Sequence, residues 1–140
     1  MKDICFRALL LAAVVAMFGC GDDEAPTAPT PTTPTTVTDT FTGTLNRNGA
    51  ATHNFVAAAS GTLTATLKSL APNSELVVGF AVGLWNASGS VCNVVLARDR
   101  AVQTTVIFGN VNAPGDLCVR VYDVGNVAEP TEYSIEVTHP

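Results

Sequence analysis

Positive charge is scarce in this chain. Seven lysine and arginine residues stand against twelve aspartate and glutamate residues, which gives a formal net charge of −5 at pH 7. The basic residues form no patch in the sequence, whereas proteins that bind nucleic acid normally present one to the phosphates. We therefore expect no nucleic-acid partner.

The chain also lacks the residue patterns of a catalytic centre. Its two histidines, His53 and His139, lie in no recognisable motif, so no base is paired with a nucleophile. No glycine-rich phosphate loop is present. We expect the protein not to be an enzyme and to need no cofactor, with both histidines as surface or half-buried residues.

Four acidic residues in the second half of the sequence could be sought as catalytic pairs, but all four fall in turns or at strand ends, where solvated carboxylates are the ordinary outcome. A weak calcium site built from them is the alternative, although no ligand spacing marks one. The residues concerned are Asp116, Asp123, Glu129 and Glu132. We predict no metal site.

No apolar run is long enough to cross a membrane. The longest, residues 8–18, falls well short of the roughly 20 residues that a transmembrane helix needs. The basic residues Lys2 and Arg7 precede this run, and the small residue Gly19 follows it. This is the pattern of an export signal, so residues 1–19 are predicted to be a signal peptide.

Cys20 follows Gly19 directly. This position resembles the lipobox of bacterial lipoproteins, in which the cysteine is lipidated and becomes the mature N-terminus. The resemblance implies a membrane anchor through lipid on Cys20, and more than one acyl chain gives durable anchoring. It places the protein in the cell envelope, and Gly21 in place of a retaining aspartate indicates the outer membrane. The alternative is an ordinary secretory signal with an incidental cysteine.

Residues 20–36 contain no large apolar side chain and cannot contribute to a core. Threonine and alanine alternate with Pro26, Pro29, Pro31 and Pro34. Proline fixes φ and removes backbone donors, so we expect a disordered, extended linker that acts as a semi-rigid spacer. Sugars attached to the threonines are the alternative role.

Residues 37–140 are enough for one domain with one core. No helical period is present, and short runs rich in Val, Thr, Leu and Phe alternate with Gly, Asn, Pro and Asp. This pattern predicts an all-β domain, an antiparallel β-sandwich of about eight strands. The predicted strands are 39–45, 51–57, 62–70, 76–85, 91–97, 103–108, 117–122 and 132–138. The strand at 76–85 is apolar on both faces, which predicts a central position.

The domain contains two cysteines, Cys92 and Cys118. In an exported protein such a pair predicts a disulfide bond. A metal site is the competing interpretation, but two cysteines without a second pair or nearby histidines make a poor ligand set.

The domain resembles the bacterial pre-peptidase C-terminal (PPC) family over nearly all of residues 39–138. The matching stretches are Phe41 to Leu45, Phe55 with Ala58 to Leu63, Asn86 to Gly89, Gly115 with Val119 to Tyr122, and Tyr133 to Val137. The resemblance implies a jelly-roll-like β-sandwich that is an accessory module of secreted enzymes. It implies substrate or matrix binding in some members and no catalysis of its own.

Trp85 is the most interesting side chain for ligand binding. A tryptophan at a strand end can stack on a sugar ring or form a hot spot for a protein. The turn from Asn86 to Ser90 follows Trp85. Tyr122 is a second aromatic residue that could contact a sugar or a protein. The candidate ligand-binding residues are therefore Trp85, Asn86 and Tyr122. Packing at the edge of the core is the alternative role for these aromatic residues.

From these observations we expect a non-catalytic, lipid-anchored protein of the cell envelope. Its β-sandwich would present a binding surface for protein or polysaccharide on loops, where recognition is common. The alternative is a structural or assembly unit of the cell surface that associates through a strand edge and has no small ligand.

Overall fold

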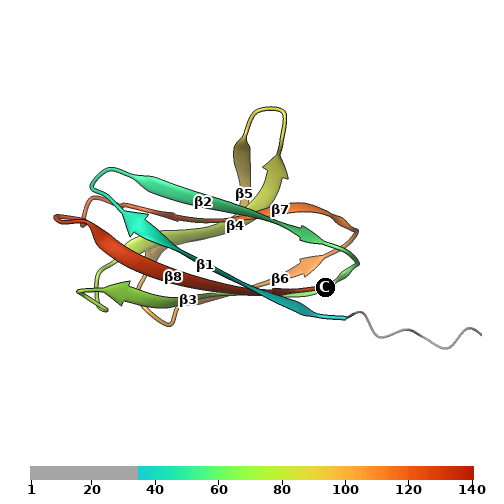
Figure 1. The fold of residues 1–140 in the computed structure, drawn as a ribbon, viewed down its shortest axis with the longest axis horizontal. Coiled ribbons are helices and arrows are strands. Elements are labelled where there is room, and N and C mark those ends of the chain that lie inside the picture. The colour runs from blue at the N-terminus through green and yellow to red at the C-terminus, as the bar shows by residue number, and fades with distance from the viewer. Residues whose placement is uncertain (1–34) are drawn as a thin grey trace, which may run out of the picture. The chain divides into compact units, whose positions relative to one another are not determined.

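The computed structural model describes residues 35–140, which form eight antiparallel β-strands (Figure 1). Their bounds are β1 (Val37–Leu45), β2 (Ala50–Ala57), β3 (Gly61–Ala71), β4 (Val78–Asn86), β5 (Val91–Ala101), β6 (Val106–Val111), β7 (Gly115–Tyr122) and β8 (Thr131–His139). The signal peptide, Cys20 and almost all of the linker predicted from the sequence lie outside the described residues. Within residues 35–140 no helix is both long and apolar enough to cross a membrane.

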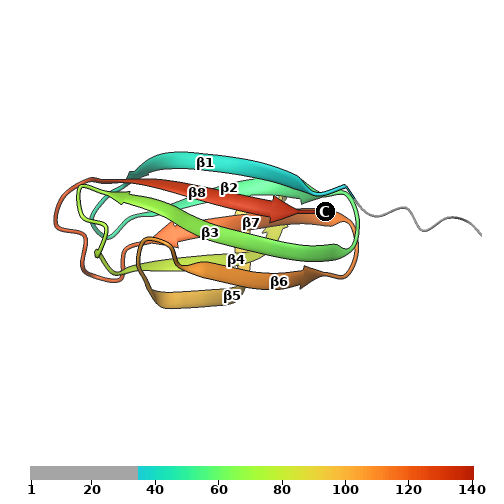
Figure 2. The same ribbon diagram turned by 90° about the horizontal axis from the view of Figure 1, so that it is seen from below.

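The strands form two four-stranded sheets with the orders β1-β8-β3-β6 and β2-β7-β4-β5. Figure 2 shows the first sheet in front of the second, with β1 lying over β2 and β6 over β5. These orders interleave the strands between sheets as an eight-stranded jelly roll does. The predicted fold class, a jelly-roll-like β-sandwich, is confirmed.

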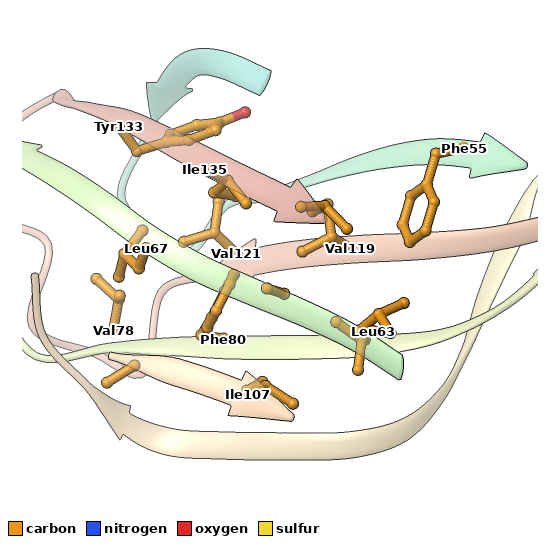
Figure 3. Close-up of a cluster of buried hydrophobic side chains, with 14 of the residues drawn as sticks. Phe55, Leu63, Leu67, Val78, Phe80, Ile107, Val119, Val121, Tyr133 and Ile135 are labelled. Carbon is orange, nitrogen blue, oxygen red and sulfur yellow. The ribbon is translucent and has the colours of Figure 1, made fainter. Parts of the chain in front are cut away.

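Alternation along the strands builds the core between the sheets. In β3 the side chains of Leu63, Ala65 and Leu67 are buried, while the threonines between them lie on the outer face. Phe80 and Ile135 enter the same core from β4 and β8 (Figure 3). Each fully buried side chain of this size stabilises the fold by roughly 1.5–3 kcal/mol.

β4 is an interior strand, between β7 and β5. All six residues from Val78 to Gly83 are buried, so both faces of the strand are covered. The central position predicted from its two apolar faces is therefore confirmed.

The sixth strand is present, but its predicted bounds were wrong. It was placed at 103–108, followed by a turn at Gly109-Asn110, whereas β6 spans 106–111 and contains both of these residues. The turn after β6 lies later, at residues 112–114. The turn before β6 occupies residues 102–105, where Thr104 has a positive φ of 74° and its amide donates to the Leu67 carbonyl at 2.7 Å. The preceding strand, β5, also runs to Ala101, four residues further than predicted.

Candidate functional site

Cys92 and Cys118 form a disulfide bond, as predicted, with their Cα atoms 5.8 Å apart. Cys118 lies in β7 between Leu117 and Val119, which face the core, so the bond is on the outer face of this sheet. It joins β7 to the edge strand β5 across β4. The bond therefore fixes the position of the β4–β5 hairpin on the sheet.

The β4–β5 hairpin bends away from the rest of the sandwich (Figure 1), and its pairing is irregular at Gly83. The pairing shifts here, because Val82 pairs with Leu96 but Gly83 pairs with Val94, which leaves Val95 as an extra residue in β5. A Cβ atom at Gly83 would lie 2.1 Å from the backbone oxygen of Asn93, so only glycine fits this bend.

Trp85 and Asn86 lie at the end of β4, within this hairpin. Trp85 is half-buried and pairs with Cys92, and Asn86 pairs with Val91. The Asn86 side-chain oxygen accepts a hydrogen bond from the Gly89 amide at 3.3 Å. Asn86 thus stabilises the turn that follows it, and Trp85 stands beside the disulfide.

Tyr122 lies in a separate cluster on the outer face of the same sheet. Its hydroxyl donates to Asp99 in β5, and the Arg120 guanidinium lies 5.6 Å from the centre of its ring. Burial, followed by the hydrogen bond to Asp99 and the charge of Asp99, raises the pKa of Tyr122 to about 12. The hydroxyl is therefore neutral at any physiological pH and already has a partner.

The structure does not bring Trp85 and Tyr122 together along the sheet. Tyr122 pairs with Gly79, and Trp85 lies six positions further along β4. At roughly 3.3 Å per residue this is a separation of about 20 Å along the strand. The three candidate residues therefore form two places on the surface, with Trp85 and Asn86 at one and Tyr122 at the other.

Aromatic rings fill the space between the sheets along β1 and β2, which we call the closed side. Phe41 stacks on His53 with ring centroids 4.9 Å apart, and Phe55 lies 4.9 Å from His139. The His53 Nε2 atom is 2.8 Å from the Tyr133 hydroxyl. Burial lowers the pKa of His53. These rings block access to the core from this side.

His139 differs from the prediction, because it is buried and not a surface or half-buried residue. Its side chain is only 4% exposed, and its Nε2 atom lies 3.1 Å from Asp39 Oδ2. It packs against Phe55, so the last strand carries it into the aromatic cluster. Both histidines therefore have structural partners on the closed side.

The opposite side of the sandwich, between the edge strands β5 and β6, is open. A cleft of about 440 Å³ lies here, which we call the edge cleft. Leu96 of β5 faces Gly109 of β6. A Cβ atom added to Gly109 would lie 3.3 Å from the Cδ1 atom of Leu96. The cleft is lined by Leu63, Val82, Gly83, Leu84, Val95, Leu96, Gly109, Asn110, Val111, Asn112, Ala113, Pro114, Gly115 and Leu117.

The lining of the edge cleft suits binding and not catalysis. It contains no charged residue, histidine, cysteine, serine or threonine, and its polar side chains are those of Asn110 and Asn112. Apolar side chains at its rim are exposed, with Val95 64% and Leu84 55% exposed to solvent. Such a cleft can hold an apolar group, and it has no side chain to act as acid, base or nucleophile.

The acidic residues considered as cation ligands do not meet. Asp123 accepts hydrogen bonds from the backbone amides of Asn48, Gly125, Asn126 and Val127, at 2.7 to 3.0 Å. The bonds to Asn48 and Val127 contribute most to lowering its pKa to about 2. In the described part of the chain, no three His, Cys, Asp or Glu side chains are placed to hold a metal ion. Asp123 instead holds two loops together.

The edge cleft was not predicted from the sequence. Its strongest signal is the run Val94-Val95-Leu96, which is apolar without alternation, although edge strands normally carry polar or charged residues. The other half of the cleft comes from β6 and the loop before β7, whose bounds were predicted least well. The sequence therefore indicated apolar residues here without showing that they are exposed.

The chain was compared with models of known protein families and with curated proteins, and neither comparison found a match.

Proposed function

We propose that this protein is a non-catalytic, lipid-anchored component of the cell envelope whose β-sandwich is a binding module. The anchor rests on the lipobox-like position of Cys20, and the role of an accessory module rests on the resemblance to the PPC family. The observation that carries the binding role is the edge cleft, an apolar site between two sheet edges.

Exposed apolar side chains gather around this cleft. Half of the ten exposed large apolar residues of the described chain lie at the end of β4 or in β5, and Leu84, Val95 and Leu96 also line the cleft. Single exposed apolar residues are normal, but a contiguous patch beside a cleft is typical of an interaction site.

Of the two ligand classes expected from the sequence, the cleft favours a protein over a polysaccharide. A sugar-binding surface uses an aromatic ring for stacking, and the lining has none. Trp85, the residue first considered for that role, is half-buried in the hairpin beside the disulfide. Apolar side chains of a partner protein match the lining better.

A structural role is the second candidate, supported by the unpaired edge of β5. β5 is long, and its residues Val94 to Leu96 are apolar and exposed. An edge of this kind is a template for pairing with another chain, and this includes a second copy of the same protein. In that case the envelope unit would assemble through β5 and would have no separate ligand.

Site-specific crosslinking tests the binding role. The full-length variant Val95→p-benzoylphenylalanine or Leu84→p-benzoylphenylalanine is mixed with an envelope extract and irradiated, and the products are identified by mass spectrometry. We expect a defined protein partner at both positions. The matched control is Val56→p-benzoylphenylalanine, since Val56 is 60% exposed and lies on β2, the other edge of the same sheet.

The same products from Val56 as from Val95, or no product other than the chain itself, would contradict the binding role. Adducts with glycan alone would restore the polysaccharide class.

A further inference from the structure

β5 has one backbone edge without a partner strand. It pairs with β4 on one side and is the last strand of its sheet. Val91, Val94, Val95 and Leu96 are all exposed on it. An unpaired edge offers backbone donors and acceptors in a row, and an extended peptide can pair with them as an added strand.

Two arginines continue the same strand beyond the cleft. Arg98 pairs with Phe80, and Leu96 pairs with Val82. Phe80 and Val82 both face the core, so Arg98 and Leu96 lie on the same face of β5. Arg98 and Arg100 are exposed, and within residues 35–140 neither forms an ion pair. Asp99 lies between them and accepts a hydrogen bond from the Tyr122 hydroxyl. The apolar edge therefore ends at two arginines and one carboxylate, a formal charge of +1, on a protein whose net charge is negative.

Two occupants from this chain itself fit poorly. The linker, residues 20–36, has no large apolar side chain to enter the cleft. An antiparallel pair of β5 strands from two copies, centred on Val95, would match the apolar residues but place Arg98 opposite Cys92 and Arg100 opposite Ser90. The exposed apolar patch on β5 is also too small for a stable dimer, because stable interfaces use about 20–30 residues a side.

We infer that β5 takes an extended segment of a partner protein as an added strand. Apolar side chains on alternate residues of the segment enter the edge cleft, and a carboxylate at one end meets Arg98 and Arg100. This inference rests on the proposed binding role of the cleft and adds the form and charge of the ligand.

The probes are two synthetic eight-residue peptides. One has two aspartates followed by alternating serine and valine, and the other has the reverse order, so the pair covers antiparallel and parallel addition to β5. Each carries a fluorescent label, and its anisotropy is measured with the full-length protein in detergent, with empty micelles as the blank. We expect one of the two peptides to bind.

Backbone N-methylation of the binding peptide tests strand addition directly. An added antiparallel strand uses the amides of alternate residues, and the other amides point to solvent. Methylation of one alternate set should weaken binding at least tenfold, while methylation of the other set should leave it within twofold. Equal effects of the two sets would overturn strand addition.

Protein variants locate the site. Val95→Asp should abolish binding, and the matched control Val56→Asp should keep it. Arg98→Gln with Arg100→Gln should weaken binding about tenfold and remove its salt dependence. Binding that survives Val95→Asp, or that keeps its salt dependence without the arginines, would overturn the inference.

The two proposals fail in distinguishable ways. If neither peptide binds while crosslinks form at Leu84 and Val95, the inference is wrong and the binding role stands. If both experiments fail, the binding role falls as well. Concentration-dependent dimers that Val95→Asp abolishes would identify a second copy as the occupant and overturn the inference.

Discussion

The two sides of this sandwich end in different ways, although each is a gap between two sheet edges. On the closed side, the rings of Phe41, His53 and Phe55 occupy the space between β1 and β2. On the open side, Leu84 and Val95 remain exposed beside a cleft of about 440 Å³ between β5 and β6.

In this small domain one gap contributes to the stability of the core, and the other is where we propose that a partner binds. A jelly roll leaves two such gaps, and filling one with rings stabilises the core, because aromatic residues bury large areas. Leaving the other gap unfilled forgoes that stabilisation and keeps apolar surface available to a partner. The disulfide joins β5 to β7 and so holds the open side in place without filling it.

The largest expected effect comes from opening the closed side. Phe55 is only 5% exposed, so Phe55→Ala should lower the free energy of unfolding by about 3–5 kcal/mol through lost burial and a cavity. The comparison variant on the open side, Leu84→Ala, should stay within about 0.5 kcal/mol of the parent because Leu84 is exposed. Urea unfolding followed by tryptophan fluorescence measures both. Equal losses would remove the distinction between the two sides.

The next largest effect should come from the disulfide. Replacing Cys92 and Cys118 by serine removes a crosslink between residues 26 positions apart, which should cost about 3.5 kcal/mol in the chain-entropy model. Hydrogen exchange should become faster in the β4–β5 hairpin before it does so around Phe41 and His53. The parent protein treated with a reductant is the control and should behave like the variant. Uniform loss of protection on both sides would contradict a local role on the open side.

The smallest expected effect is an acid sensitivity of the closed side. Burial lowers the pKa of His53 below its usual 6.5, so the unfolded chain binds a proton more readily than the folded one. Stability should therefore fall as the pH decreases through about 6.5. His53→Gln should show a shallower fall between pH 7 and 5.5 in thermal unfolding. An unchanged pH profile in this variant would exclude His53 as the source.

Much of the architecture could be predicted from the sequence, because alternation is a local property. Between Thr62 and Lys68, the apolar residues Leu63, Ala65 and Leu67 alternate with polar ones. The structure has a strand here with the predicted apolar face buried. β6 was misplaced because a glycine and an asparagine usually mark a turn, whereas Gly109 lies in a strand and faces the Leu96 side chain of β5. Only the neighbouring strand reveals that reason.

The sequence by itself indicated an antiparallel β-sandwich, the central position of β4 and the pairing of Cys92 with Cys118, because these follow from the pattern of residue types and from the presence of only two cysteines in the domain. Tertiary structure decided which apolar residues became core and which became surface. Phe41 meets His53 and Phe55 only because the fold lays β1 over β2. Val95 is exposed because β5 is an edge strand, and strand order is set by the packing of the whole chain.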